Sequence, residues 1–315
     1  MLELRHRHRA AGDGQRRRDL NADAAAPTRR ACLGAFAAFA LLGAAGCAAP
    51  PAAPGFDWEA KLHGDAVVLL GEVHDNAGLH RQRLAVLQRA VAAGWRPAMA
   101  MEQFDVDRQA DIERARRERP GDAGHLIAQA GGSGWDWKHY RPLIELALAQ
   151  ALPLVAANLP PAQARRLVRE EAPAVLGAAR AAELALDGPG ALPIEAAWRA
   201  AQQGEIARGH CDALPAALLP GMARAQFARD AVMADALRRH ASRGVVLLAG
   251  NGHVRRDIGV PRWLAQVAPA RLWAVGFLER GEADDAWSRA FDAVVLGAAA
   301  PRSDPCAAVR VPGAR

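Results

Sequence analysis

Six short aliphatic runs recur along the chain, each four or five residues long. They span residues 66–70, 98–101, 154–157, 245–249, 272–275 and 293–296. Runs of this length, rich in Val, Leu and Ala, are typical of strands that are buried on both faces of a parallel sheet. Helical patterns separate the runs, and such alternation indicates βαβ units. We therefore predict an α/β fold with a mainly parallel sheet flanked by helices.

The first helix is expected directly after the first run. Leu84, Leu87 and Val91 share one helix face, and Asp75 or Asn76 is the expected N-cap. A second helix is expected over residues 143–152, just before the third run. Both helices connect consecutive strands, as a parallel sheet requires.

Residues 160–240 break this alternation. They are rich in Ala, Arg and Leu, are punctuated by Pro and Gly, and contain no strand pattern. We expect a smaller helical lobe here, inserted between the strands that precede Asn158 and His253. Residues 59–300 then form one domain that includes this insertion, and residues 301–315 form a C-terminal tail.

Polar side chains follow four of the predicted strands, and two of the turns have the pattern Gly-x-x-His. The residues are Glu72, His74, Glu102, Asn158, Asn251 and His253. In open α/β sheets, the loops beyond the carboxyl ends of the strands form the ligand crevice. We expect the two histidines at the same sheet edge, with both glutamates close by. A single glutamate at a strand end is equally explained as an anchor for a turn, but several converging polar groups favour a functional site.

Gln226, Asp230 and Met233 are spaced to share one helix face ahead of the strand that leads to His253. In one interpretation this face closes over the crevice, and Asp230 accepts a ring N–H from His74 or His253. In the other it is a solvated stripe with an incidental methionine. The sequence leaves both interpretations open.

The first 46 residues are expected to be an export signal. Thr28-Arg29-Arg30 precedes an uncharged stretch that ends in Ala44-Ala45-Gly46-Cys47, which is typical of a bacterial lipoprotein signal with lipidation at Cys47. The paired arginines leave both the general and the twin-arginine export routes open. Residues 47–58 then form a tether, and we expect an outer-membrane lipoprotein that faces the periplasm.

The basic character of the chain comes largely from this leader. Residues 1–46 contain eight arginines and four acids, whereas the whole chain has 40 basic and 34 acidic residues and a formal charge of +6. The remaining chain is therefore close to neutral, and its charge does not indicate nucleic-acid binding. Outside the leader and Cys47, two cysteines remain, Cys211 and Cys306. They form a disulfide in an oxidising compartment or remain isolated thiols, and their spacing does not decide between these alternatives.

Six motifs resemble, in the same order, those of the ChaN-like haem-binding uptake lipoproteins. They are VLLGEVHDN (68–76), AMEQF (100–104), WDWKHY (135–140), AANLP (156–160), AQFARDAVMA (225–234) and AGNGHVR (249–255). The resemblance implies a ChaN-like haem-binding domain with a parallel sheet and a helical lobe. It also implies a role in iron uptake, with haem or an iron-porphyrin held by a homodimer and an outer-membrane haem or siderophore receptor as a partner.

Haem needs an axial donor, apolar walls and cations for its propionates. His74, His253, Met233 and Tyr140 are the candidate donors, and Arg255 is the candidate propionate partner. Tyr140 is the only tyrosine of the chain, and it is equally explained as an amphipathic aromatic residue at a helix start. Glu72, Glu102, Asn158 and Asp230 complete the predicted cofactor site, so the axial ligand stays open.

The paired Gly-x-x-His turns also resemble the wider superfamily of Tiki metalloproteases and erythromycin-esterase-like enzymes. This resemblance implies an alternative function, a metal-dependent hydrolase with Glu72, His74, Glu102 and His253 around one divalent metal ion. The sequence lacks a helical His-Glu-x-x-His pair and a Gly-x-Ser-x-Gly elbow. We therefore favour a haem-binding protein over an enzyme.

Overall fold

The computed structural model describes residues 57–281, 285–304, 306 and 307. They belong to the larger of two compact units, residues 56–315. The predicted signal peptide, Cys47 and nearly all of the predicted tether lie outside the described residues. Among the described residues, no helix combines the length and apolar character of a membrane span.

The centre of the fold is a six-stranded sheet in which every pair of neighbouring strands is parallel. The strands are β1 (Val67–Leu70), β2 (Ala98–Asp105), β3 (Leu154–Asn158), β4 (Val245–Leu248), β5 (Leu272–Glu279) and β6 (Ala293–Gly297). Their order is β3-β2-β4-β1-β5-β6. This architecture confirms the predicted α/β class, and each of the six aliphatic runs forms a strand.

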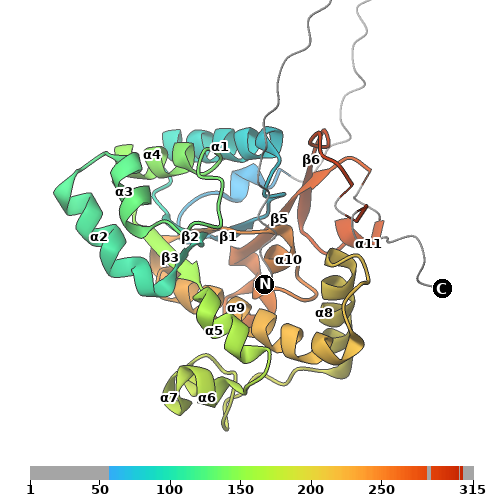
Figure 1. Ribbon diagram of the computed structural model, residues 1–315. Helices are drawn as coiled ribbons and strands as arrows, with labels where there is room; N and C mark the ends of the chain where they lie inside the picture. Colours follow the sequence, from blue (N-terminus) through green and yellow to red (C-terminus); the bar gives the residue numbers. More distant parts are fainter. Residues whose placement is uncertain (1–56, 282–284, 305, 308–315) are drawn as a thin grey trace, which may run out of the picture. The chain divides into compact units, whose positions relative to one another are not determined.

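Alternating side chains of the strands enter two hydrophobic cores, one on each face of the sheet. In β1, Val67 and Leu69 pack into one core, whereas Val68 and Leu70 pack into the other. Figure 1 shows helices on both sides of the sheet. One face carries α1 (Ala77–Ala92), α2 (Gln109–Glu118), α3 (Ala123–Ala130) and α4 (Arg141–Ala149). Covering both faces explains the unbroken apolar runs in the strands, which give way to polar residues only toward the carboxyl ends of β2, β3 and β5.

Helix α1 starts as the sequence predicts. The side chain of Asn76 accepts a hydrogen bond from the backbone N–H of Leu79 at 2.9 Å and so caps the helix. Leu87 and Val91 are buried on its inner face. The cap fixes the point at which the chain leaves the turn that carries His74.

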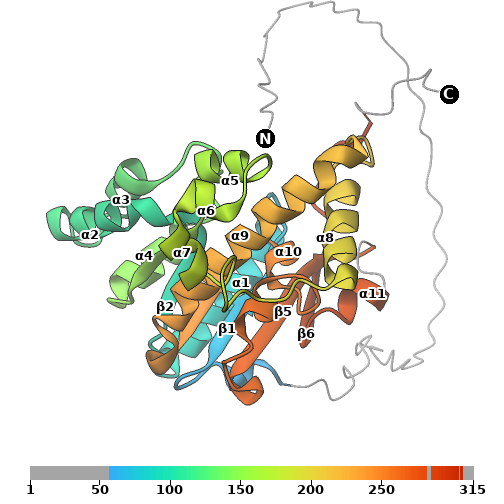
Figure 2. The ribbon, with the colours of Figure 1, turned by 90° about the horizontal axis from the view of Figure 1, so that it is seen from below.

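The segment 160–240 is helical, and the structure describes all of it. Its helices are α5 (Pro161–Leu167), α6 (Ala172–Leu176), α7 (Ala178–Glu183), α8 (Ala196–Gly209) and α9 (Leu219–Arg238). Helix α9 does more than form a peripheral lobe, because Phe227, Ala231 and Leu237 are buried in the second core. Figure 2 shows α9 running across the sheet. This helix therefore brings its polar residues to the sheet.

The remaining elements are short. They are α10 (Asn251–Val254), α11 (Asp285–Ser288) and the 3-10 helices at Glu59–Lys61, Val106–Arg108, Ala216–Leu218, Ala241–Arg243, Val260–Leu264 and Pro269–Arg271.

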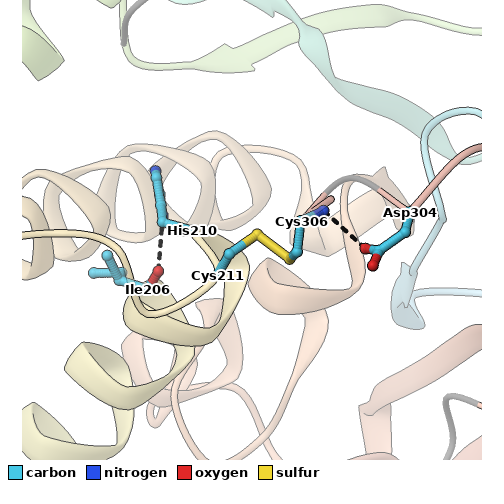
Figure 3. Close-up of a disulfide and its surroundings, with 5 residues drawn as sticks. All are labelled: Ile206, His210, Cys211, Asp304 and Cys306. Atoms are coloured by element: carbon cyan, nitrogen blue, oxygen red, sulfur yellow. Dashed lines mark hydrogen bonds between the residues drawn. A yellow bond between two sulfur atoms is a disulfide. The ribbon is translucent and has the colours of Figure 1, made fainter. Parts of the chain in front are cut away.

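A disulfide joins Cys211, in the connection between α8 and α9, to Cys306, beyond β6 (Figure 3). The two Cα atoms are 5.5 Å apart. Each end is fixed locally: His210 Nδ1 hydrogen-bonds Ile206 O at 2.7 Å, and the Cys306 N–H donates to Asp304 Oδ1 at 2.8 Å. The structure thus decides between the alternatives that the sequence left open.

The strand order places a topological switch point between β1 and β4. These strands are neighbours, but the chain leaves β1 toward the face of α1 and leaves β4 toward the face of α9. Such a topological switch point is where open α/β sheets bind ligands, beyond the carboxyl ends of the strands. Both Gly-x-x-His turns lie at this point.

Candidate functional site

The two Gly-x-x-His turns meet at the carboxyl edge of the sheet, as the sequence predicts. The His74 ring packs against Gly250, where an added Cβ would lie 3.1 Å from both Cε1 and Nε2 of His74. Glycine leaves room for this approach. The N–H of Gly250 donates to Glu102 Oε2 at 2.8 Å, so β2 contributes its glutamate to the same site.

Glu72 is the buried anchor of the first turn. Its Oε1 accepts hydrogen bonds from Tyr140 Oη and His74 Nδ1, each at 2.7 Å, and it lies 3.3 Å from Gln103 Nε2. Its other oxygen pairs with the fully buried guanidinium of Arg83. Burial opposes the charge of Glu72, but Arg83 and His74 hold its pKa well below the ordinary value. The carboxylate is therefore ionised and fixed.

His74 is the accessible imidazole of the site, with 52% of its side chain exposed. Its Nδ1–H points to Glu72, and its Nε2 has no hydrogen-bond partner among the described residues. Desolvation lowers its pKa, but the hydrogen bond to Glu72 and the charge of Glu102 outweigh this effect and raise it. Trp135 lies beside the ring, with 5.2 Å between ring centroids. A carboxylate on the far nitrogen is the arrangement that orients metal-ligating histidines.

His253 has the opposite environment, since the residue is only 7% exposed. Its Nδ1 lies 2.5 Å from Asp230 Oδ1, and its Nε2 lies 3.4 Å from Glu102 Oε1. Burial lowers its pKa, but these two carboxylates outweigh burial and raise the pKa to about 10. The ring is therefore held as a buried imidazolium, with each of its nitrogens facing a carboxylate.

Asp230 and Met233 both lie on α9, but only Asp230 contacts a residue of the site. Asp230 is buried and accepts the ring N–H of His253, one of the two roles expected for it. Burial raises its pKa to about 6. Met233 is fully buried in the apolar core. The structure does not bring its sulfur to the ligand edge.

Asn158, at the end of β3, belongs to a polar network at the same edge of the sheet. It donates to Asp105 Oδ1 at 2.9 Å and accepts from Arg229 Nη1 at 3.0 Å. The same nitrogen of Arg229 lies 3.9 Å from Glu102 Oε1. Asn158 therefore reaches Glu102 only through Arg229, and β2 separates its strand from β4.

The other predicted haem contacts are already engaged inside the protein. Tyr140 is 1% exposed, and its hydroxyl donates to Glu72; burial raises its pKa far above the ordinary value. Arg255 pairs with Glu205 at 2.9 Å and with Asp257 at 2.6 Å. Neither side chain is free for iron or for a propionate in this arrangement.

Sequence reasoning missed two arginines, the fully buried Arg83 and the partly buried Arg229. Arg83 lies between Leu79 and Val86 on the inner face of α1, where all three residues are buried. An arginine on the apolar face of a helix needs a buried carboxylate partner. The position of Arg83 on the apolar face of α1 could therefore have predicted a buried acidic partner, which is Glu72.

The donor set does not fit a bare metal ion. Among the described residues, no group of three or more His, Cys, Asp or Glu side chains is placed to hold one. The physical reason is that Glu72, Glu102 and His253 are already engaged, by Arg83, by the N–H of Gly250 and by Asp230 respectively. Of the four ligands that the sequence suggests for this alternative site, only His74 keeps an unengaged donor nitrogen among the described residues.

Comparison with known proteins identifies the family. The family model described as "Haem-binding uptake, Tiki superfamily, ChaN" matches residues 58–264. The chain belongs to this family. The matched segment contains both Gly-x-x-His turns and α9, so the whole candidate site lies within it. A search of curated proteins found no match.

Solved structures resemble the chain to different degrees. The ChaN structure from Campylobacter jejuni, described as showing cofacial haem binding, is 20% identical over 71% of this chain and 84% of that chain, with a TM-score of 0.57. The type III effector HopBA1 is 14% identical over 74% and 88% of the two chains, with a TM-score of 0.40. A mutant of the erythromycin esterase EreC, in its open conformation, is 14% identical over 69% and 71%, with a TM-score of 0.36. The ChaN match supports the architecture of the sheet and helices, not individual residue roles.

Proposed function

We propose that the chain is an exported lipoprotein that binds haem or an iron-porphyrin for iron uptake, with His74 as the axial donor to the iron. The observation that carries this proposal is the environment of His74. The imidazole is half exposed at the ligand edge of the sheet, its Nδ1–H is held by Glu72, and its Nε2 is unengaged among the described residues. Membership in a haem-binding uptake family supports the same function.

Several residues of the chain would hold the porphyrin, each by a different contact. His74 supplies the nitrogen, and Glu72 keeps its ring oriented and increases its basicity through the Nδ1–H bond. Arg83 and Tyr140 hold Glu72 in turn. Trp135 offers an apolar ring beside His74 for a macrocycle. Iron supplies the affinity for the imidazole nitrogen when the porphyrin is bound.

Export to the periplasm is part of the proposal. The leader pattern before Cys47 supports lipidation, although these residues lie outside the described ones. The Cys211–Cys306 disulfide supports an oxidising compartment independently, because such bonds persist outside the cytosol. Mass spectrometry of the membrane fraction is expected to show a lipid-bearing cysteine at position 47 and no residues 1–46. An intact leader in that fraction would contradict this part.

A homodimer is the proposed assembly, and an outer-membrane haem or siderophore receptor is the proposed partner. The ChaN of Campylobacter jejuni binds haem cofacially, and two copies of this chain would each offer one His74. Light scattering is expected to show a dimer when haemin is added. A monomer that binds one haemin at saturation would exclude the cofacial arrangement but not the ligand.

The test of the function is a haemin titration of the mature protein followed in the Soret region, with metal analysis of the same sample. We expect saturable binding by the wild type and a loss of affinity of at least tenfold in His74→Ala, about 1.4 kcal/mol. His63→Ala is the matched control. His63 is an exposed histidine that precedes β1, whereas His74 follows β1 at the ligand edge. Equal affinity in the wild type and His74→Ala would overturn the proposal. Tight retention of a divalent metal without haemin binding would favour the hydrolase alternative.

A further inference from the structure

A small cavity of about 250 Å³ lies beside the turn of His74, between the start of α1 and the residues that lead into α4. Its base is a stack of His80 and His139, with ring centroids 4.8 Å apart and an interplanar angle of 5°. The side chain of His139 is only 9% exposed. Figure 1 shows α1 and α4 on the same side of the sheet, and the two helices are in contact.

His80 connects this cavity to His74. Its Nε2–H donates to the backbone oxygen of His74 at 3.0 Å, and its Nδ1 accepts from Arg83 at 3.1 Å. Burial and the charge of Arg83 lower the pKa of His80 to about 4, so the ring is neutral. It forms a stacking surface and holds the backbone of the turn in place.

The walls of the cavity are apolar, and its rim is cationic. Ala77, Leu84 and Pro142 line the walls. At the rim, Lys138 pairs with Asp136 at 2.5 Å, whereas exposed Arg81 has no hydrogen bond or ion pair among the described residues. Arg81 is therefore the uncompensated charge of the cavity, and it favours an anion.

The size of the cavity indicates which part of a ligand it takes. Small-molecule sites usually enclose about 300–1,000 Å³, so this cavity holds an arm of a ligand and not a macrocycle. An arm with a short hydrocarbon stem and a terminal carboxylate matches apolar walls beneath an arginine. The two propionate side chains of a haem have this chemistry.

We propose that the cavity binds a propionate of the porphyrin whose iron contacts His74, with Arg81 as the partner of the carboxylate. This inference rests on the proposed function, because it takes the porphyrin as the ligand. It replaces the expectation for Arg255, whose guanidinium is paired with Glu205 and Asp257.

Metal-free protoporphyrin IX and its dimethyl ester test the cavity without iron ligation. Fluorescence titration is expected to show that the wild type binds the free acid about tenfold more tightly than the ester, since a charge-assisted hydrogen bond is lost on esterification. Arg81→Ala is expected to weaken binding of the free acid by a similar factor and to leave binding of the ester unchanged. Arg117→Ala, an exposed arginine on α2, is the control and should change neither.

The outcomes separate this inference from the proposed function. His74→Ala removes the iron ligand, so it should leave the preference for the free acid intact. Equal binding of acid and ester, no binding of either, or equal effects of Arg81→Ala and Arg117→Ala would overturn the propionate assignment. Haemin ligation by His74 would stand in each of these cases. His74→Ala could instead leave haemin affinity unchanged while Arg81→Ala abolishes the preference for the free acid over the ester. In that case the role of His74 as iron ligand is wrong, and the propionate assignment of the cavity stands.

Discussion

The two Gly-x-x-His turns have the same pattern and follow neighbouring strands, yet their histidines have opposite environments. His74 is half exposed, with one ring nitrogen held by Glu72. His253 is buried between Asp230 and Glu102, and it is protonated at neutral pH. One turn thus presents a donor nitrogen, and the other is an internal ion pair.

The difference comes from the residues packed against each turn. Helix α9 lies over the second turn and supplies Asp230 and Gln226 to the ring of His253. The first turn is held by Arg83 and Tyr140, which both bind Glu72 and leave His74 accessible. A motif therefore reveals where a histidine lies, whereas the packing around it decides whether it binds a ligand.

The largest expected effect is a difference in the free energy of unfolding between the variants His253→Ala and His74→Ala. His253→Ala leaves the buried carboxylate of Asp230 without its hydrogen-bonded cation, and breaking a buried pair in this way costs about 3–5 kcal/mol. His74→Ala removes one hydrogen bond from Glu72, which keeps Arg83, so the expected loss is about 1 kcal/mol. Urea denaturation at pH 7 measures both free energies of unfolding. Equal losses would remove the distinction between the turns.

The second prediction concerns pH. The folded-state pKa of His253, about 10, lies above its ordinary value of 6.5. Its contribution to stability is therefore complete below pH 6.5 and is lost as pH rises through 10. Asp230, with a pKa of about 6, is already ionised over most of this window. We expect the urea midpoint of the wild type to fall between pH 7 and pH 10.

The variant His253→Gln is the control for the pH effect. It removes the titrating group while keeping a hydrogen-bonding side chain, so its stability should depend less on pH in the same window. A wild-type midpoint that is constant from pH 7 to pH 10 would contradict the buried imidazolium. An identical fall in both proteins would assign the effect to other groups.

The smallest expected effect concerns Tyr140, which holds the first turn. Tyr140→Phe removes the hydrogen bond to Glu72 and is expected to cost about 1 kcal/mol of folding stability. It should leave haemin affinity nearly unchanged, because Glu72 still holds His74. Loss of the Soret change in this variant would instead make the phenol an iron ligand. Parallel denaturation and haemin titrations measure the two quantities.

The sequence predicted the elements and the edge of the sheet on which the site lies. Aliphatic runs mark every strand because the sheet is covered on both faces, and parallel strands place Glu72, Glu102 and both turns at one edge. The position of β4 between β2 and β1 could not be predicted from the sequence, because strand order depends on long-range packing.

The state of each side chain was less predictable than its position. Tyr140 and Met233 have the right chemistry for a haem donor, but the first is bound to Glu72 and the second is in the core. Arg255 is paired with acids from the helical segment and its own loop. Nothing in the sequence marks Glu72 as the partner of Tyr140, or Glu205 and Asp257 as the partners of Arg255. Only the packed structure shows that these side chains are engaged.

Nuclear magnetic resonance of protein labelled with ¹⁵N at histidine tests the central claim most directly, with gallium(III) protoporphyrin as a diamagnetic analogue of haem. The imidazole nitrogens of His74, His253 and His63 are assigned through the His74→Ala, His253→Gln and His63→Ala variants. We predict that the analogue shifts the Nε2 resonance of His74, because the metal binds at this free nitrogen while Glu72 holds the other one, and that the resonances of both His253 nitrogens stay unchanged. A shift at His253 with none at His74, or saturable binding without any histidine shift, would contradict the account.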